Sequence, residues 1–391
     1  MCSFERIQSL SKCHFDKYEN SGLPQRLIDV MIGDQTKIRL IEVNGRHEYL
    51  ALSYCWGSCG QKIATVNDLS QLRSGIALRS LSRTVQDAIT LYRSLGIRYL
   101  WVDALCIIQE GDGGADFARE SPKMALIYAQ AYATIATASG RSSDKSFLFQ
   151  PRTQLIAVPF HETPNSTADG DLLFKQRPFD FLEEFEEETF DSPLARRGWA
   201  MQERLCSRRT IHFTTSQFFF ECKSFFYAEN GVSCPLLGYD GFRHPNTFTD
   251  ILNMLSDTKE SSNMTPVRYL LQLAWSNIVE EYSRLQLTRS TDRLPAISGL
   301  ARLISLHFPC RYLSGLWENT LSGSLRWVPK SRPMTIVQEK GVPSWSWANT
   351  TDAVRIATQN FMDDDTESCI TLQDVYTSAT NAEVLVVRGK I

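Results

Sequence analysis

Residues 99–109, Tyr-Leu-Trp-Val-Asp-Ala-Leu-Cys-Ile-Ile-Gln, form an apolar segment interrupted by a single acid, Asp103. Aromatic and β-branched residues dominate this segment, which predicts a buried strand. An ionised carboxylate is costly to bury without a partner, because it loses its hydration. We therefore expect Asp103 to be paired, hydrogen-bonded or placed at the mouth of a cleft.

Two further strands are predicted on either side of this segment, at residues 49–53 and 132–138. Both are short apolar runs that end at turn-forming residues. Helical segments separate the three strands, so the chain alternates strand, helix, strand, helix, strand. This order predicts an α/β fold with a parallel sheet and flanking helices.

The helical segments are recognised from the spacing of their apolar residues. Residues 85–95 and 124–131 each place apolar side chains on one helical face, and Thr84 with Asp87 predicts a capping box before the first of them. A third helix is predicted over residues 193–205, which contain Trp199 and Glu203.

The carboxyl ends of the three predicted strands carry the polar and glycine residues of this region. They are Ser53 to Gly57, Asp103 and Ser139. In open α/β sheets, ligands bind beyond the carboxyl ends of the parallel strands. The pattern therefore predicts a functional site at one edge of the sheet.

The chain divides into three predicted parts. Residues 1–46 form an N-terminal β extension with strands near 25–31 and 37–43, and residues 47–222 form the main domain, with an insertion at about 140–192. Residues 223–391 form an accessory region of mixed helices and strands. No Pro/Gly/Ser-rich linker separates the parts, so we expect the accessory region to pack on the main domain.

Composition narrows the classes of partner. The chain has 41 basic and 44 acidic residues and no basic stripe, so a nucleic-acid partner is not expected. Neither a signal peptide nor an apolar run that spans a bilayer is evident, which predicts a cytoplasmic protein without a membrane partner. The ten cysteines are dispersed, and their spacing supports neither a disulfide framework nor a metal site.

Several blocks of the chain, in order, resemble the fungal heterokaryon incompatibility (HET) domain family. The blocks are Tyr49-Leu-Ala-Leu-Ser-Tyr-Cys-Trp-Gly57, Thr84 to Ile89, Leu95 to Gln109, Glu120 to Tyr128 and Arg197-Gly-Trp-Ala-Met-Gln-Glu-Arg204. Downstream, Asp292 to Leu300 and Pro343-Ser-Trp-Ser-Trp347 are similar to segments that accompany this domain. Phe117 stands where the family usually has tryptophan.

This resemblance implies a fungal source and a role in non-self recognition between cells, with the HET domain as a cell-death effector. The domain is also similar to TIR domains, which implies a TIR-like, flavodoxin-like core. Ser53-Tyr54 and Trp101-Val-Asp103 resemble two TIR strands. Trp199 and Glu203 reproduce the spacing that carries the catalytic glutamate of enzymatic TIR domains.

Enzymatic TIR domains cleave the nicotinamide–ribose bond of NAD, so the resemblance implies NAD as a substrate, with no bound cofactor. Such a cleavage passes through an oxocarbenium-like transition state that a carboxylate stabilises. Glu203 is the candidate for this carboxylate. The candidate substrate-binding residues are Ser53, Tyr54, Trp56, Asp103, Arg197, Trp199 and Arg204: Tyr54 or Trp56 for stacking, the arginines for phosphates, and Asp103 for a ribose hydroxyl.

Other interpretations stay open. Glu203 beside two arginines also fits a structural ion pair, and Asp103 fits an acid that caps backbone amides. At the level of function, the alternatives are a non-catalytic module that signals by homotypic assembly and a HET scaffold recruited to small-molecule metabolism. Self-association through the HET domain and a protein partner from an incompatibility locus are the partners that the resemblance implies.

Overall fold

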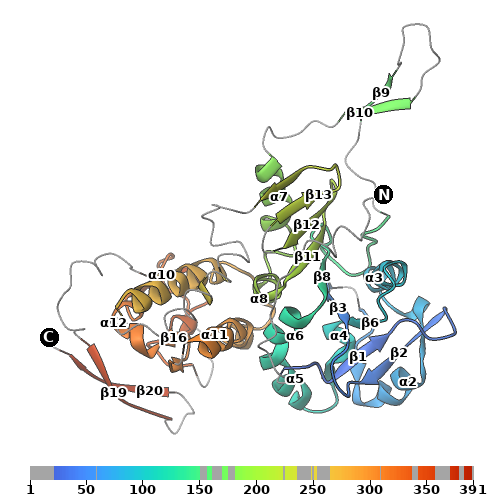
Figure 1. Ribbon diagram of the computed structural model, residues 1–391. Coiled ribbons are helices and arrows are strands. Elements are labelled where there is room, and N and C mark those ends of the chain that lie inside the picture. The colour runs from blue at the N-terminus through green and yellow to red at the C-terminus, as the bar shows by residue number, and fades with distance from the viewer. Residues whose placement is uncertain are drawn as a thin grey trace.

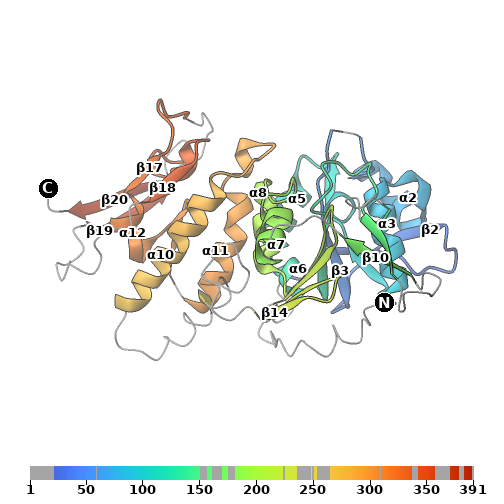
Figure 2. The same ribbon diagram turned by 90° about the horizontal axis from the view of Figure 1, so that it is seen from above.

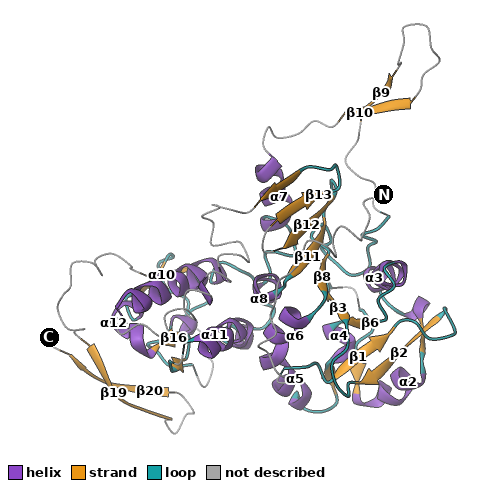
Figure 3. Cartoon of the chain, viewed as in Figure 1, coloured by secondary structure: helices purple, strands orange, loops and turns teal. Residues whose placement is uncertain are grey.

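The computed structural model describes residues 22–58, 60–149, 156–160, 170–174, 181–222, 225–235, 248, 251–252, 265–308, 310–336, 342–356, 370–377 and 383–389. The first 21 residues of the predicted N-terminal extension and parts of the predicted insertion lie outside this set. A large sheet with its helices occupies one side of the molecule, and a mainly helical region occupies the other (Figures 1 and 3).

Ten strands of the described residues form the main sheet, in the order β14-β13-β12-β11-β8-β3-β6-β1-β2-β5. They are β1 (Arg26–Asp29), β2 (Lys37–Glu42), β3 (Tyr49–Ser53), β5 (Ile76–Ala77), β6 (Tyr99–Trp101), β8 (Ala133–Ala136), β11 (Arg209–Phe213), β12 (Phe218–Cys222), β13 (Phe225–Ala228) and β14 (Ser233–Pro235). Two short strands, β4 (Ala64–Thr65) and β7 (Ile108–Glu110), form a small separate sheet.

The main sheet is mixed, which corrects the predicted parallel sheet. The pairs β11–β8, β8–β3 and β3–β6 are parallel, whereas β1, β2 and β5 on one side and β12 to β14 on the other are joined antiparallel. Antiparallel neighbours need only a short connection, such as the turn between β11 and β12, while parallel neighbours need a longer crossover. The α/β class is as predicted, but a flavodoxin-like arrangement is not what the whole sheet shows.

Residues 99–109 do not form the single strand that their apolar character predicts. The strand β6 ends at Trp101, and one helical turn, α4 (Asp103–Cys106), follows before β7. The Asp103 carboxylate accepts the Ala104 N–H at 2.8 Å, and the Cys106 N–H donates to the Val102 carbonyl at 2.7 Å. An acid at a helix start is favourable because it meets unpaired N–H groups, and this local preference ends the strand.

Helices pack around the strands of the main domain. They are α2 (Leu69–Ser74), α3 (Arg83–Ser94), α5 (Ala115–Glu120), α6 (Met124–Gln130) and α8 (Gly198–Cys206). The predicted capping box at the start of α3 is wrong. The Thr84 hydroxyl donates to the Lys145 carbonyl at 2.8 Å, and Asp87 accepts the Phe147 N–H at 2.9 Å. Both side chains therefore hold the loop that follows β8 rather than the helix start.

The predicted insertion contains a hairpin and a helix. The hairpin, β9 (Ile156–Phe160) and β10 (Gly170–Phe174), extends away from the main sheet (Figure 1). The acidic run lies on α7 (Phe181–Phe190), where Phe185 is buried against Phe219 and Phe226. The helix therefore packs on β12 and β13.

The C-terminal region is built on two long helices, α10 (Thr265–Tyr282) and α11 (Pro295–His307). Shorter elements complete it: α12 (Leu321–Ser324) and the hairpins β15 (Tyr312–Leu313) with β16 (Leu316–Trp317), β17 (Trp327–Pro329) with β18 (Val354–Ile356), and β19 (Ile370–Thr377) with β20 (Glu383–Gly389). Figure 2 shows α8 between α11 and the sheet, and both α6 and α8 contact α11.

Two tryptophan side chains of this region converge on one glycine. The indole N–H groups of Trp275 and Trp347 donate to the Gly315 carbonyl at 2.8 and 2.9 Å. Gly315 has a φ of +101°, and a Cβ there would lie 2.6 Å from the Trp347 indole nitrogen. A glycine is therefore required where the backbone approaches these buried rings.

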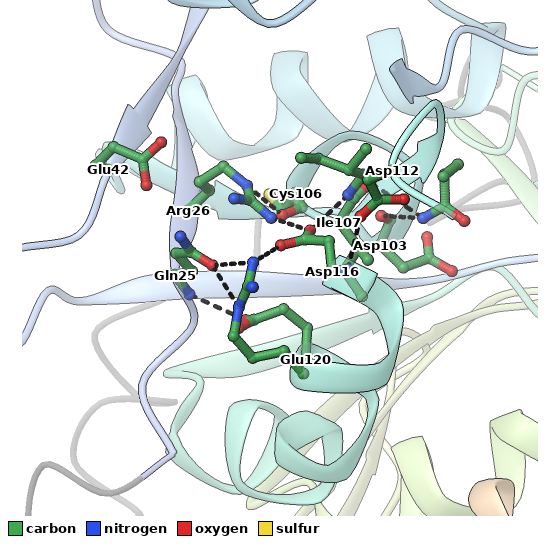
Figure 4. A network of polar contacts seen from close by, with 12 residues as sticks. Gln25, Arg26, Glu42, Asp103, Cys106, Ile107, Asp112, Asp116 and Glu120 are labelled. Atoms are coloured by element: carbon green, nitrogen blue, oxygen red, sulfur yellow. Dashed lines mark hydrogen bonds and ion pairs between the residues drawn. The ribbon is translucent and has the colours of Figure 1, made fainter. Parts of the chain in front are cut away.

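A buried ion network ties the N-terminal hairpin to the α4 turn (Figure 4). The Arg26 guanidinium donates to Asp116 and, at 2.8 Å, to the Cys106 carbonyl, and Arg26 and Asp116 are only 2% and 1% exposed. Asp116 also accepts the Ile108 N–H at 2.7 Å. Glu120, one turn further along α5, accepts the Gln25 N–H at 3.1 Å. The network joins β1 and α5 to the end of the turn that begins with Asp103.

Replacing Arg26 by alanine is expected to lower the free energy of unfolding by about 3 kcal/mol, because Asp116 would keep its buried charge without this partner. Urea denaturation measures the loss. Arg73→Ala is the matched control, since Arg73 pairs with Glu42 on the surface and exposed pairs contribute less than about 1 kcal/mol. Equal losses in the two variants would contradict a stabilising role for the buried network.

Candidate functional site

Glu203 and Ser53 meet at the carboxyl end of β3. All five residues of β3 are buried, and Ser53 is the last of them. Glu203 lies on α8, is 3% exposed, and accepts a hydrogen bond from the Ser53 hydroxyl. The predicted catalytic residue and one predicted binding residue are therefore in direct contact, 150 positions apart in the chain.

Arg197 provides the positive charge beside Glu203. Its guanidinium donates to the Tyr54 carbonyl, so it is held against the residue that follows β3. From there it acts electrostatically on both Glu203 and Asp103. The geometry joins an arginine and two carboxyl groups at the edge where the sequence predicts a site.

Burial raises the pKa of Glu203 to about 7. The positive charge of Arg197 and the hydrogen bond from Ser53 partly offset this rise, whereas the Asp103 carboxyl adds to it. The pKa of Asp103 is also raised by burial, with Arg197, the Ala104 N–H and Trp56 acting in the opposite direction. Glu203 is therefore divided between its neutral and ionised forms near neutral pH.

The two predicted stacking residues, Tyr54 and Trp56, differ in how far their side chains are buried. Tyr54 is 2% exposed and its hydroxyl donates to Gln61 at 2.8 Å, so its ring lies in the core. Trp56 is half-buried, and its indole N–H donates to Asp103 at 3.1 Å. Trp56 is therefore partly accessible beside the Asp103 carboxyl, and Tyr54 is not accessible.

Trp199 lies one helical turn before Glu203 and is partly exposed. Its indole N–H donates to Asp292 at 3.1 Å, and its ring packs edge to face against Phe117, with the ring centroids 6.0 Å apart. Phe117, the residue that replaces the family's tryptophan, therefore still contributes an aromatic ring here. The predicted binding residue Trp199 is held jointly by α5 and the C-terminal region.

Arg204 points away from Glu203. Its guanidinium pairs with Glu221 on β12 at 3.0 Å and lies 3.7 Å from the centre of the Phe190 ring. Glu221 also contacts His212 at 2.8 Å. The structure therefore groups Ser53, Trp56, Asp103, Arg197 and Glu203, and it places Arg204 in a separate ion cluster between α7 and β12.

Three residues that contact this site are not among the predicted ones. Tyr128 on α6 faces Glu203 and donates to the Leu52 carbonyl at 3.1 Å, and in the sequence it is only one member of an apolar helical face. Gln202 and Asp292 link α8 to the C-terminal region. The position of Asp292 in a downstream HET-associated segment is the one sequence signal that pointed to it.

A small cavity lies beside Ser53, on the side of α8 that carries Ala200 and Arg204. Its volume is about 30 Å³, and hydroxyl groups from Thr134, Thr189, Ser192 and Thr210 contribute to its lining. A cavity of this size and polarity has room for about one water molecule. The cavity is too small to hold a nucleotide.

The described residues contain no group of three or more metal-ligating side chains placed to hold a metal ion. Among the helices within the described ranges, none has the length and apolarity needed to cross a membrane.

Comparison with known proteins gives one match. Residues 49–203 match the family model described as heterokaryon incompatibility protein (HET). No curated protein and no solved structure matches the chain. The matched range begins with β3 and ends at Glu203, so it contains Ser53, Trp56, Asp103, Arg197 and Glu203 but not Asp292.

The raised pKa of Glu203 predicts a pH-dependent stability. The folded protein binds this proton more tightly than the unfolded chain, so the free energy of unfolding falls as pH rises from about 4.5 to about 7, by about 3 kcal/mol. Glu203→Gln, which stays neutral, is expected to lose this dependence. Urea unfolding of both proteins across that range measures the difference, and parallel curves would contradict the raised pKa.

Proposed function

We propose that this chain, whose residues 49–203 form a heterokaryon incompatibility (HET) domain, acts as a cell-death effector in non-self recognition between fungal cells. The family match supports a role in heterokaryon incompatibility. Our proposal adds that the protein causes cell death and that a specific chemical reaction brings this about.

The chemistry we propose is hydrolysis of NAD at the nicotinamide–ribose bond. The observation that carries it is the Glu203 carboxyl, placed by Ser53 at the carboxyl edge of parallel strands with a pKa of about 7. Near neutral pH a substantial fraction of this group is ionised, and its negative charge stabilises an oxocarbenium-like transition state. Arg197 and Asp103 tune that fraction through their own charges.

The reaction balances without a cofactor. The bond between the ribose C1′ and the nicotinamide nitrogen breaks, and the bonding pair neutralises the pyridinium, so nicotinamide leaves uncharged. Water adds its oxygen to C1′ and releases a proton, which leaves ADP-ribose. The partly exposed rings of Trp56 and Trp199 are the stacking surfaces for the substrate, and Arg197 faces its diphosphate.

A second function is favoured by one specific observation. Glu203 is 3% exposed and already accepts a hydrogen bond from Ser53, as a structural carboxylate does. In this alternative the HET domain is a non-catalytic module that signals by self-association or by binding a partner from an incompatibility locus.

Purified protein incubated with NAD at high protein concentration tests the proposal, because the resemblance to TIR domains implies a site that self-association completes. We expect nicotinamide release that falls at least about 100-fold in Glu203→Gln. Glu42→Gln, which changes an exposed glutamate on β2, is the matched control and is expected to retain full activity.

Expression of the same variants in fungal cells separates the two functions. Catalysis predicts that Glu203→Gln abolishes cell death while the protein stays folded. Retained cell death, together with no nicotinamide release from the folded wild-type protein, would exclude catalysis and leave the signalling module.

A further inference from the structure

The segment that joins α10 to α11 is bonded directly to the start of α8. Its Gln286 N–H donates to the Arg196 carbonyl at 2.7 Å, and its carbonyl accepts the Gly198 N–H at 2.8 Å. These two bonds enclose Arg197, which forms a parallel bridge with Gln286. The backbone of the arginine that faces Glu203 is thus fixed by the C-terminal region.

Two further contacts hold the next turns of α8. Asp292 accepts the Trp199 indole N–H at 3.1 Å, and the buried Gln202 side chain accepts the Gly299 N–H, also at 3.1 Å. A Cβ at Gly299 would lie 2.7 Å from the Ala125 Cβ, so α11 approaches α6 and α8 as closely as a glycine permits. The contacts at residues 286, 292 and 299 lie along one side of α8.

Glu203 lies one turn after Trp199 on α8, and among the described residues Ser53, not the C-terminal region, donates a hydrogen bond to the carboxyl of Glu203. Its ionisable neighbours come from the sheet edge and from α6 and α8: Tyr54, Cys55, Asp103, Tyr128 and Arg197. Of these five neighbours, Arg197 is the one that carries a positive charge. The placement of Arg197 therefore determines how readily Glu203 ionises.

We propose that residues 286–299 of the C-terminal region are positioning elements of the HET site, which hold Arg197 and Trp199 in place against Glu203. The effect of residues 286–299 on catalysis rests on the proposed function. Their effect on the ionisation of the Glu203 carboxyl does not depend on it. The C-terminal region thereby influences Glu203 through Arg197 and Trp199. A partner that displaces this segment would change the charge on Glu203.

Gln286→Pro tests the proposal, because proline removes the N–H that bonds to Arg196. Release of Arg197 is expected to raise the pKa of Glu203 by about one unit. NMR titration of protein labelled at the glutamate carboxyl carbons measures this pKa, and the Glu203 signal is identified by its loss in Glu203→Gln. Gln286→Ala keeps the backbone N–H and is the matched control, with an unchanged pKa.

Gly198→Ala provides a second route should the proline variant fail to fold. A Cβ at Gly198 would lie 2.6 Å from a Leu287 methyl group and 3.0 Å from the Leu287 Cγ, so the Leu287 side chain must shift at the contact with residue 198 while every donor remains. We expect the pKa of Glu203 to rise in this variant as well. An unchanged Glu203 pKa in a folded displacement variant would overturn the proposal.

NAD turnover provides the catalytic arm of the experiment. In Gln286→Pro, nicotinamide release is expected to fall about fivefold at neutral pH, since a rise in the Glu203 pKa from about 7 by about one unit lowers the ionised fraction by that factor. If the wild-type protein does not hydrolyse NAD, only the proposed activity is contradicted. The NMR titration of Glu203 still decides whether residues 286–299 position Arg197.

Discussion

The constraint on which this site depends is the burial of a carboxyl group beside the last residue of β3. A buried acid is stable only when hydrogen bonds and an opposite charge compensate for lost hydration. Ser53 supplies the hydrogen bond and Arg197 supplies the charge. Because Arg197 is anchored to the Tyr54 carbonyl, the same sheet edge carries both compensating groups, and α8 is held across it.

Buried contacts outside the site hold the backbone segments that carry its charged residues. Arg26 and Asp116 fix the turn that begins with Asp103, and the C-terminal segment fixes the backbone around Arg197. Each network joins parts of the chain that are remote in sequence. The site is therefore a property of the whole fold, in which the N-terminal hairpin and the C-terminal region each hold one of its charged groups.

Much of the fold could be predicted from periodicity. The strands at residues 49–53 and 133–136 and the helix at 83–94 follow from apolar spacing, because each element buries one face. The length of the strand at 99–109 and the capping box at Thr84 could not be predicted in this way. Asp103 bonds to the N–H of the next residue and ends the strand locally, whereas Asp87 bonds to the Phe147 N–H, which only folding brings near.

By itself, the sequence determined the family resemblance, the alternation of strands and helices, and the location of polar residues at the carboxyl ends of the strands. Tertiary structure alone decided which partner each charged side chain takes. Arg204 follows Glu203 on α8, and successive helical positions point about 100° apart, so its side chain leaves the helix in another direction. Arg197 precedes the helix, and its hydrogen bond to the Tyr54 carbonyl places its charge beside Glu203. Arg204 instead meets Glu221 on β12, and Trp199 meets Asp292, because those surfaces pack against the other faces of α8.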